Sequence, residues 1–171
     1  FSIKISMTQF SNKNFLIMSI SFLISISFFP FAVDAAPTYV QGKANNSNSA
    51  SSLTVTFDNN VVAGSVIAVY TRWANTSNTL NTITSTCVTG NLTLVNNPTT
   101  GGSARMAMAY GMVSSPGVCS VTANYSGSQN IQLIVHEISG IDTASPLDVS
   151  SAAVSGWTTA ANSGSATTNY D

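Results

Sequence analysis

The sequence predicts an all-β fold, an antiparallel β-sandwich of the jelly-roll-like or immunoglobulin-like kind, preceded by a signal-peptide helix. Val, Ile, Thr, Tyr and Phe recur in short runs that Gly, Asn, Ser and Pro separate, which is typical of strands and turns. Charged residues make up only 6% of the 171 residues, against roughly 25% in an ordinary soluble domain. This length supports one domain with a real core rather than two.

The N-terminal segment has the pattern of a secretory signal peptide. Lys13 supplies a positive charge, residues 15–31 are apolar, and small residues precede a cleavage site after Ala35. A helix that stays in the membrane is the alternative, but serines interrupt the run, which at ~17 residues is at the lower limit for spanning. We therefore expect residues 1–35 to be upstream sequence and signal peptide. Residues 36–171 should form a single β-sandwich domain, truncated before its last strand.

The first half of the mature part alternates between short strands and polar turns. Its predicted strands are residues 38–43, 53–57, 65–73, 80–87 and 92–95. Alternation along 53–57 puts every second, apolar side chain into the core. Apolar residues occur on both faces of 65–73, which predicts a central strand. Its inward face is the set Ile67, Val69, Thr71 and Trp73. Residues 45–52 are polar and predict a turn, and the weakly patterned 80–87 predicts an edge strand.

In the second half, residues 104–113 alternate large and small side chains. Ala and Met also favour helices, but strict alternation and Gly111 favour a strand. We expect the large set to fill the core, namely Met106, Met108, Tyr110 and Met112. Residues 118–125 and 131–139 are predicted as two strands joined by a tight connection at 126–130. Residues 152–159 are a candidate for one more strand.

Residues 131–142 form the most apolar run outside the N-terminus and hold the only histidine, His136, and the only glutamate, Glu137. Adjacent residues on a strand point to opposite faces, so these two side chains are poorly placed to act together on one substrate. The run predicts a central, buried strand at 131–138. A turn at 139–142 then directs the chain toward Pro146.

Several segments together resemble a bacterial extracellular β-sandwich repeat module. They read L-T-V-T-F at 53–57, A-G-S-V-I-A-V at 63–69, M-A-Y-G at 108–111, E-I-S-G-I-D at 137–142 and S-P-L-D at 145–148. The last two are similar to that family's E-Y-S-G-L-D and N-P-L-D segments, and S-G-S-A-T-T at 163–168 to the Ser/Thr tract before its last strand. The resemblance covers about 38–168 and departs at His136, Ile138 and the two cysteines. It implies a sandwich within a large secreted or surface protein, without assigned catalysis.

Cys87 and Cys119 are the only cysteines. An even count behind an export signal predicts a disulfide, and closing a loop of about 30 residues would stabilise the fold by roughly 3–4 kcal/mol. Two separate buried thiols are the alternative, and a zinc site lacks ligand spacing. Four N-x-[ST] sequons matter only if the source glycosylates them; they begin at Asn45, Asn75, Asn91 and Asn124.

Acidic and aromatic side chains supply the remaining candidates for a site. Glu137 with Asp142 or Asp148 could form a glycosidase pair, but Asp in turns more often bonds to its own backbone. The three carboxylates therefore predict a structural corner, or a calcium site with loop carbonyls; no other cofactor is expected. Exposed aromatic rings could stack on sugars, although such rings also cover core edges. The candidate rings are Trp73, Tyr125, Trp157 and Tyr39.

We expect a secreted or cell-surface, non-catalytic module with a structural or adhesive role in a larger extracellular protein. Its expected partners are glycans or neighbouring repeat modules. The net charge of −1 leaves no basic footprint for nucleic acid, and membrane contact is expected only through the signal peptide. A carbohydrate-binding module of an exported enzyme is the second hypothesis, and a small exported hydrolase is the third.

Overall fold

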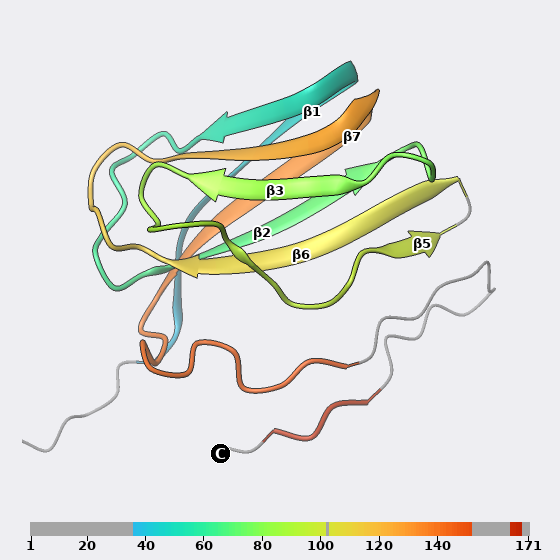
Figure 1. The fold of residues 1–171 in the computed structure, drawn as a ribbon. Helices are drawn as coiled ribbons and strands as arrows, with labels where there is room; N and C mark the ends of the chain where they lie inside the picture. The colour runs from blue at the N-terminus through green and yellow to red at the C-terminus, as the bar shows by residue number, and fades with distance from the viewer. Residues whose placement is uncertain (1–35, 102, 152–164, 169–171) are drawn as a thin grey trace, which may run out of the picture. The chain divides into compact units, whose positions relative to one another are not determined.

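A computed structural model describes residues 36–101, 103–151 and 165–168, with the side chains of 99–101 excepted. The described residues contain seven strands and no helix (Figure 1). The strands are β1 (Thr38–Thr56), β2 (Val66–Trp73), β3 (Leu80–Ser85), β4 (Thr93–Leu94), β5 (Thr99–Gly101), β6 (Ala104–Met112) and β7 (Ser120–Ser139). All of their pairings are antiparallel, which confirms the all-β antiparallel prediction. In this part of the chain there is no helix long and apolar enough to cross a membrane. The predicted signal peptide and the candidate strand at 152–159 lie outside the described residues.

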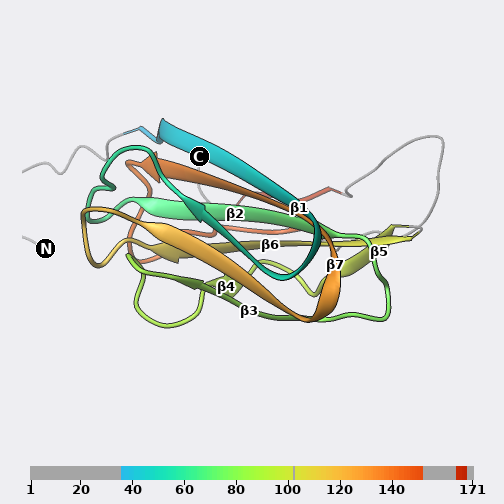
Figure 2. The ribbon, with the colours of Figure 1, turned by 90° about the horizontal axis from the view of Figure 1, so that it is seen from above.

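The long strand β7 organises the sheet. The strand order is β1-β7-β2-β6-β4, with β3 also paired to β7 and β5 paired to β6. β7 has 20 residues and pairs with β1 from Thr38↔Ser139 to Thr56↔Ser120. Its register with β1 shifts between Ser47 and Ser52, and Figure 2 shows the two strands curving together.

The bend divides the sheet into two arms. The wide arm contains residues 38–47 of β1 and 131–139 of β7, together with β2, β6, β4 and β5. The narrow arm contains residues 52–56 of β1, residues 120–125 of β7, and β3. Apolar side chains from both arms form one cluster, so the core lies between the arms.

Polar contacts also join the arms. The Tyr125 ring lies 5.3 Å from the Trp73 ring, and its hydroxyl is hydrogen-bonded to Thr71 Oγ1. Thr71 Oγ1 donates its own hydrogen to the Gln132 carbonyl at 3.0 Å, so Tyr125 must be the donor to Thr71. Burial raises the pKa of Tyr125 to about 12, further above neutral pH, so the hydroxyl carries the proton that this donor role requires. Across the bend of β1, Asn45 Nδ2 donates to the Thr54 carbonyl at 3.0 Å.

Two predicted connections are wrong, because residues 45–52 and 126–130 lie within β1 and β7. Both stretches are polar and rich in Ser and Asn, and the second also contains Gly127, which is the composition of turns. Each is nevertheless paired to the other strand, and the register shifts take up the extra residues. The two polar segments therefore form the bend of one continuous ladder.

The disulfide prediction is confirmed. Cys87 follows β3, Cys119 precedes β7, and the two are bonded across a sequence separation of 32. Both cysteines belong to the core cluster. The bond therefore ties the segment after β3 to the segment that leads into β7.

The side-chain directions in β2 match the prediction, and those in β6 are reversed. The inward set of β2 from Ile67 to Trp73 is buried, and 131–138 is a central strand between β1 and β2. In β6, Ala107 and Ala109 are buried, whereas Met108 is 55% exposed. A Cβ on Gly111, which shares the alanine face, would lie 2.7 Å from Val88 Cγ1. Only small side chains fit beneath the segment that follows β3, so the methionines point outward.

Substitutions on the two faces of β6 test this assignment. Leu at position 109 should destabilise the protein by about 1–3 kcal/mol, because added methylenes overfill a packed core. Met108→Leu, on the exposed face, should change the free energy of unfolding by less than about 0.5 kcal/mol. Urea denaturation of Ala109→Leu and Met108→Leu measures both, and equal effects would contradict the assigned faces.

Candidate functional site on the outer face of the wide arm

Trp73 and Tyr125 do not form an exposed aromatic platform. The Trp73 ring is fully buried, and Tyr125 is 5% exposed. Each ring packs against the other, and Trp73 Nε1 donates to the Asn78 carbonyl at 3.0 Å. Stacking on a sugar needs an exposed ring face, which these two residues lack. Trp157, the third candidate, lies outside the described residues.

Glu137 is fully buried and holds a loop. Its Oε1 accepts a hydrogen bond from the Val62 amide at 2.8 Å, and its Oε2 accepts one from Gln41 Nε2 at 2.7 Å. Gln41 in turn brackets Asn59, donating to its carbonyl at 3.1 Å and accepting from its amide at 3.2 Å. Both carboxylate oxygens therefore fasten the loop between β1 and β2 to the end of the wide arm.

The other two acidic candidates lie near the surface after β7. Asp142 Oδ1 accepts a hydrogen bond from the Ala144 amide at 2.9 Å, which closes a turn. Asp142 and Asp148 are both exposed. Within the described residues, no three His, Cys, Asp or Glu side chains gather as a potential metal site. Calcium binding at this corner stays a prediction.

His136 points to the opposite face from Glu137. Its ring lies 5.8 Å from the Tyr39 ring, at an angle of 59°. It also covers Gly42, where a Cβ would overlap His136 Nδ1. Among the sequence-predicted aromatic candidates that lie in the described residues, the exposed Tyr39 is the one on this outer face.

The register of the wide arm places side chains on its outer face in rows. Residues directly opposite each other in a ladder share a face. From β1 through β7 and β2 to β6, two neighbouring rows are Asn46–Gln132–Arg72–Met106 and Ala44–Ile134–Tyr70–Met108. The next row contains Gly42, His136, Ala68 and Tyr110. Arg72 is the permanently charged side chain among amides, aromatic rings and thioethers.

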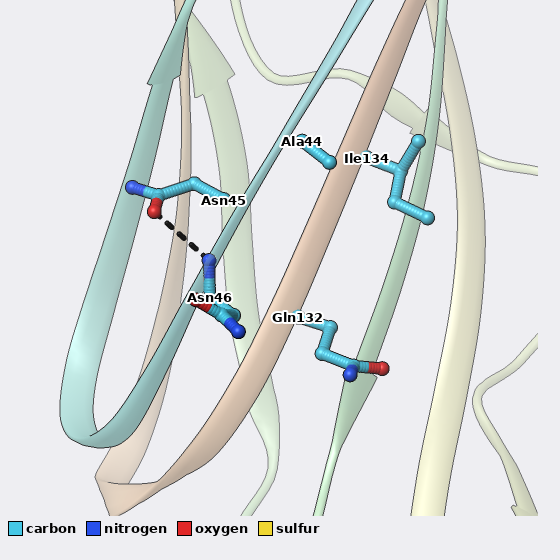
Figure 3. A pocket seen from close by; sticks show the side chains of 5 residues that line it. All are labelled: Ala44, Asn45, Asn46, Gln132 and Ile134. Carbon is cyan, nitrogen blue, oxygen red and sulfur yellow. Dashed lines mark hydrogen bonds between the residues drawn. The ribbon is translucent and has the colours of Figure 1, made fainter.

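A shallow hollow of about 380 Å³ lies over β1 and β7 on this face (Figure 3). Its lining residues are Ala44, Asn45, Asn46, Gln132 and Ile134. Asn45 points away toward the narrow arm, and its Oδ1 accepts the Asn46 amide at 2.9 Å. No hydrogen bond to another described residue engages the side-chain amide of Asn46 or Gln132. The hollow therefore combines apolar surface from Ala44 and Ile134 with two available amide groups.

Sequence reasoning missed these residues because they come from separate strands. Residue 46 lies in a polar stretch that predicts a turn, and residue 44 comes just before it. Arg72 alternates with the predicted inward set of its strand, which indicates only that it faces outward. One signal was available in the sequence. Gln132, Ile134 and His136 alternate with a buried, apolar set, which indicates that they share the outer face. Comparisons of the chain with family models, curated proteins and solved structures gave no match.

Replacing Glu137 with Gln tests its structural role. The change keeps the size but puts an NH₂ group against a donor, either the Val62 amide or Gln41 Nε2. Leaving a buried donor unpaired should cost about 1–3 kcal/mol of stability. Asp58→Asn is the control, because it removes the negative charge from the exposed Lys43–Asp58 pair, and surface pairs contribute about 0–1 kcal/mol. An unfolding temperature of Glu137→Gln equal to or above that of the wild type would contradict the structural role of Glu137.

Proposed function

We propose that this chain is a secreted or cell-surface β-sandwich module with a structural or adhesive role and no catalytic activity of its own. The observation that carries the proposal is the pair of facing arms around one core, with a disulfide between Cys87 and Cys119. Two facing arms correspond to the two layers of a sandwich. Disulfides persist in oxidising, extracellular compartments.

The engagement of Glu137 supports a role other than catalysis. A glycosidase needs two carboxyl groups that flank one bond of the substrate. Both oxygens of Glu137 instead accept hydrogen bonds from Val62 and Gln41 inside the fold. The resemblance to extracellular repeat modules points in the same direction.

An adhesive role is supported by the outer face of the wide arm. This face is broad and almost uncharged, and it exposes Met108 and Tyr39. Exposed apolar and amide groups suit weak, repeated contacts with another surface. The hollow with its available amides also supports the second hypothesis, a carbohydrate-binding module of an exported enzyme.

Production of the full chain in an oxidising secretory host tests the proposal. We expect export, a mature N-terminus at Ala36 and no titratable thiol. Reduction should lower the free energy of unfolding by roughly 3–4 kcal/mol, because the disulfide no longer restricts the unfolded chain. Mass spectrometry and chemical denaturation measure these outcomes.

Beads coated with the same protein should adhere to surfaces of polysaccharide or protein. The protein should release no reducing sugars from the polysaccharide. An unprocessed intracellular chain with two free thiols would contradict the extracellular assignment. Release of reducing ends by the purified protein would instead support the hydrolase hypothesis.

A further inference from the structure

We propose that the hollow over β1 and β7, together with Arg72, binds a saccharide that carries a carboxylate, such as a uronic acid oligosaccharide. This inference rests on the proposed adhesive function and names its ligand class. Three observations carry it: a guanidinium and two amides that no described residue engages, and an apolar surface on the same face.

The charge of Arg72 has no partner in the described part of the chain. The ion pair found there joins Lys43 Nζ to Asp58 at 2.5 Å, and no hydrogen bond to a described residue engages the guanidinium. Arg72 is half-buried on β2, flanked in register by Gln132 and Met106. A guanidinium presents parallel N–H groups that match the two oxygens of a carboxylate. Charge complementarity therefore favours an anionic ligand.

The neighbouring hollow favours a sugar over a simple anion. Its apolar part, Ala44 and Ile134, can contact the C–H face of a sugar ring, and Tyr70 extends this row on β2. Its amides, on Asn46 and Gln132, offer both donors and acceptors to hydroxyl groups. Pockets that combine apolar surface with a few polar groups of this kind are typical of small-ligand sites.

The spacing of the strands connects the two parts. Asn46, Gln132 and Arg72 occupy one row on three successive strands. Adjacent strands are ~4.8 Å apart, so the row spans about 10 Å between the backbones of β1 and β2. A short oligosaccharide can extend across this row, with hydroxyls at the amides and a carboxylate at Arg72. A neutral saccharide would leave the guanidinium without a partner.

Calorimetric titration of the full chain, produced as above, tests the inference with three probes. These are trigalacturonate, maltotriose as a neutral trisaccharide, and sodium acetate as a simple carboxylate. Trigalacturonate should bind at least tenfold more tightly than maltotriose, and added salt should weaken its binding by screening the charge. Acetate at the same concentration should give no comparable heat.

Two variants and a matched control assign the effect to this face. Arg72→Gln should weaken trigalacturonate binding at least tenfold, and Gln132→Ala, at an exposed side chain, should weaken it severalfold. Lys43→Gln removes the same charge from the Lys43–Asp58 pair and should leave binding within twofold of wild type. Unfolding temperatures establish that each variant is folded. If Arg72→Gln is unfolded, the affinity of Gln132→Ala for trigalacturonate decides whether the ligand binds on this face.

The inference would be overturned if maltotriose and trigalacturonate bind with equal affinity and if Arg72→Gln leaves both affinities unchanged. Equal binding of acetate would overturn it by showing an adventitious anion only. Beads that adhere while no saccharide binds would also overturn it, yet would leave the adhesive function standing. Failure of export or of disulfide formation would instead count against the proposed function.

Discussion

The pairing of β1 with β7 along their whole length is the constraint on which the rest of the structure depends. Odd-numbered residues of β7 are buried on both sides of the bend, as Val121 and Ala123 in the narrow arm and Leu133 and Val135 in the wide arm show. The period-two alternation thus continues through the bend. A single strand supplies inward side chains to both arms, and folding it over closes the core.

The same alternation that builds the core also builds the outer face. Because odd-numbered residues of β7 face inward, Gln132, Ile134 and His136 must face outward. Pairing with β2 brings Arg72 beside Gln132, and pairing with β1 brings Asn46 there. A one-residue slip of either register would place these groups on opposite faces. The proposed recognition on this face therefore depends on the same ladder that determines stability.

Local patterns predicted what depends on local chemistry. The inward set of β2, the strand character of β6 and the disulfide followed from alternation, Gly111 and the even cysteine count. Which side chains of β6 point inward could not be predicted from alternation, because both faces of the strand are apolar. The inward set is decided by the space beneath Val88, which is remote in sequence. Alternation also predicted that Trp73 faces inward, but its packing against Tyr125 is a contact between residues far apart in the sequence, which local patterns do not predict. The row through Asn46, Gln132 and Arg72 required the register of three strands, which nonlocal pairing determines.

Native-state amide hydrogen exchange, followed by NMR on the full chain, tests most directly whether β7 joins the two arms into one cooperative unit. Core elements that open only by global unfolding exchange with the global free energy. The amides of residues 121–125 and 131–138 that are hydrogen-bonded in the ladders should exchange together in the slowest class. Both groups should share one dependence on denaturant. If residues 121–125 exchange independently through a smaller opening, the two arms are separate units and the shared strand does not organise the fold.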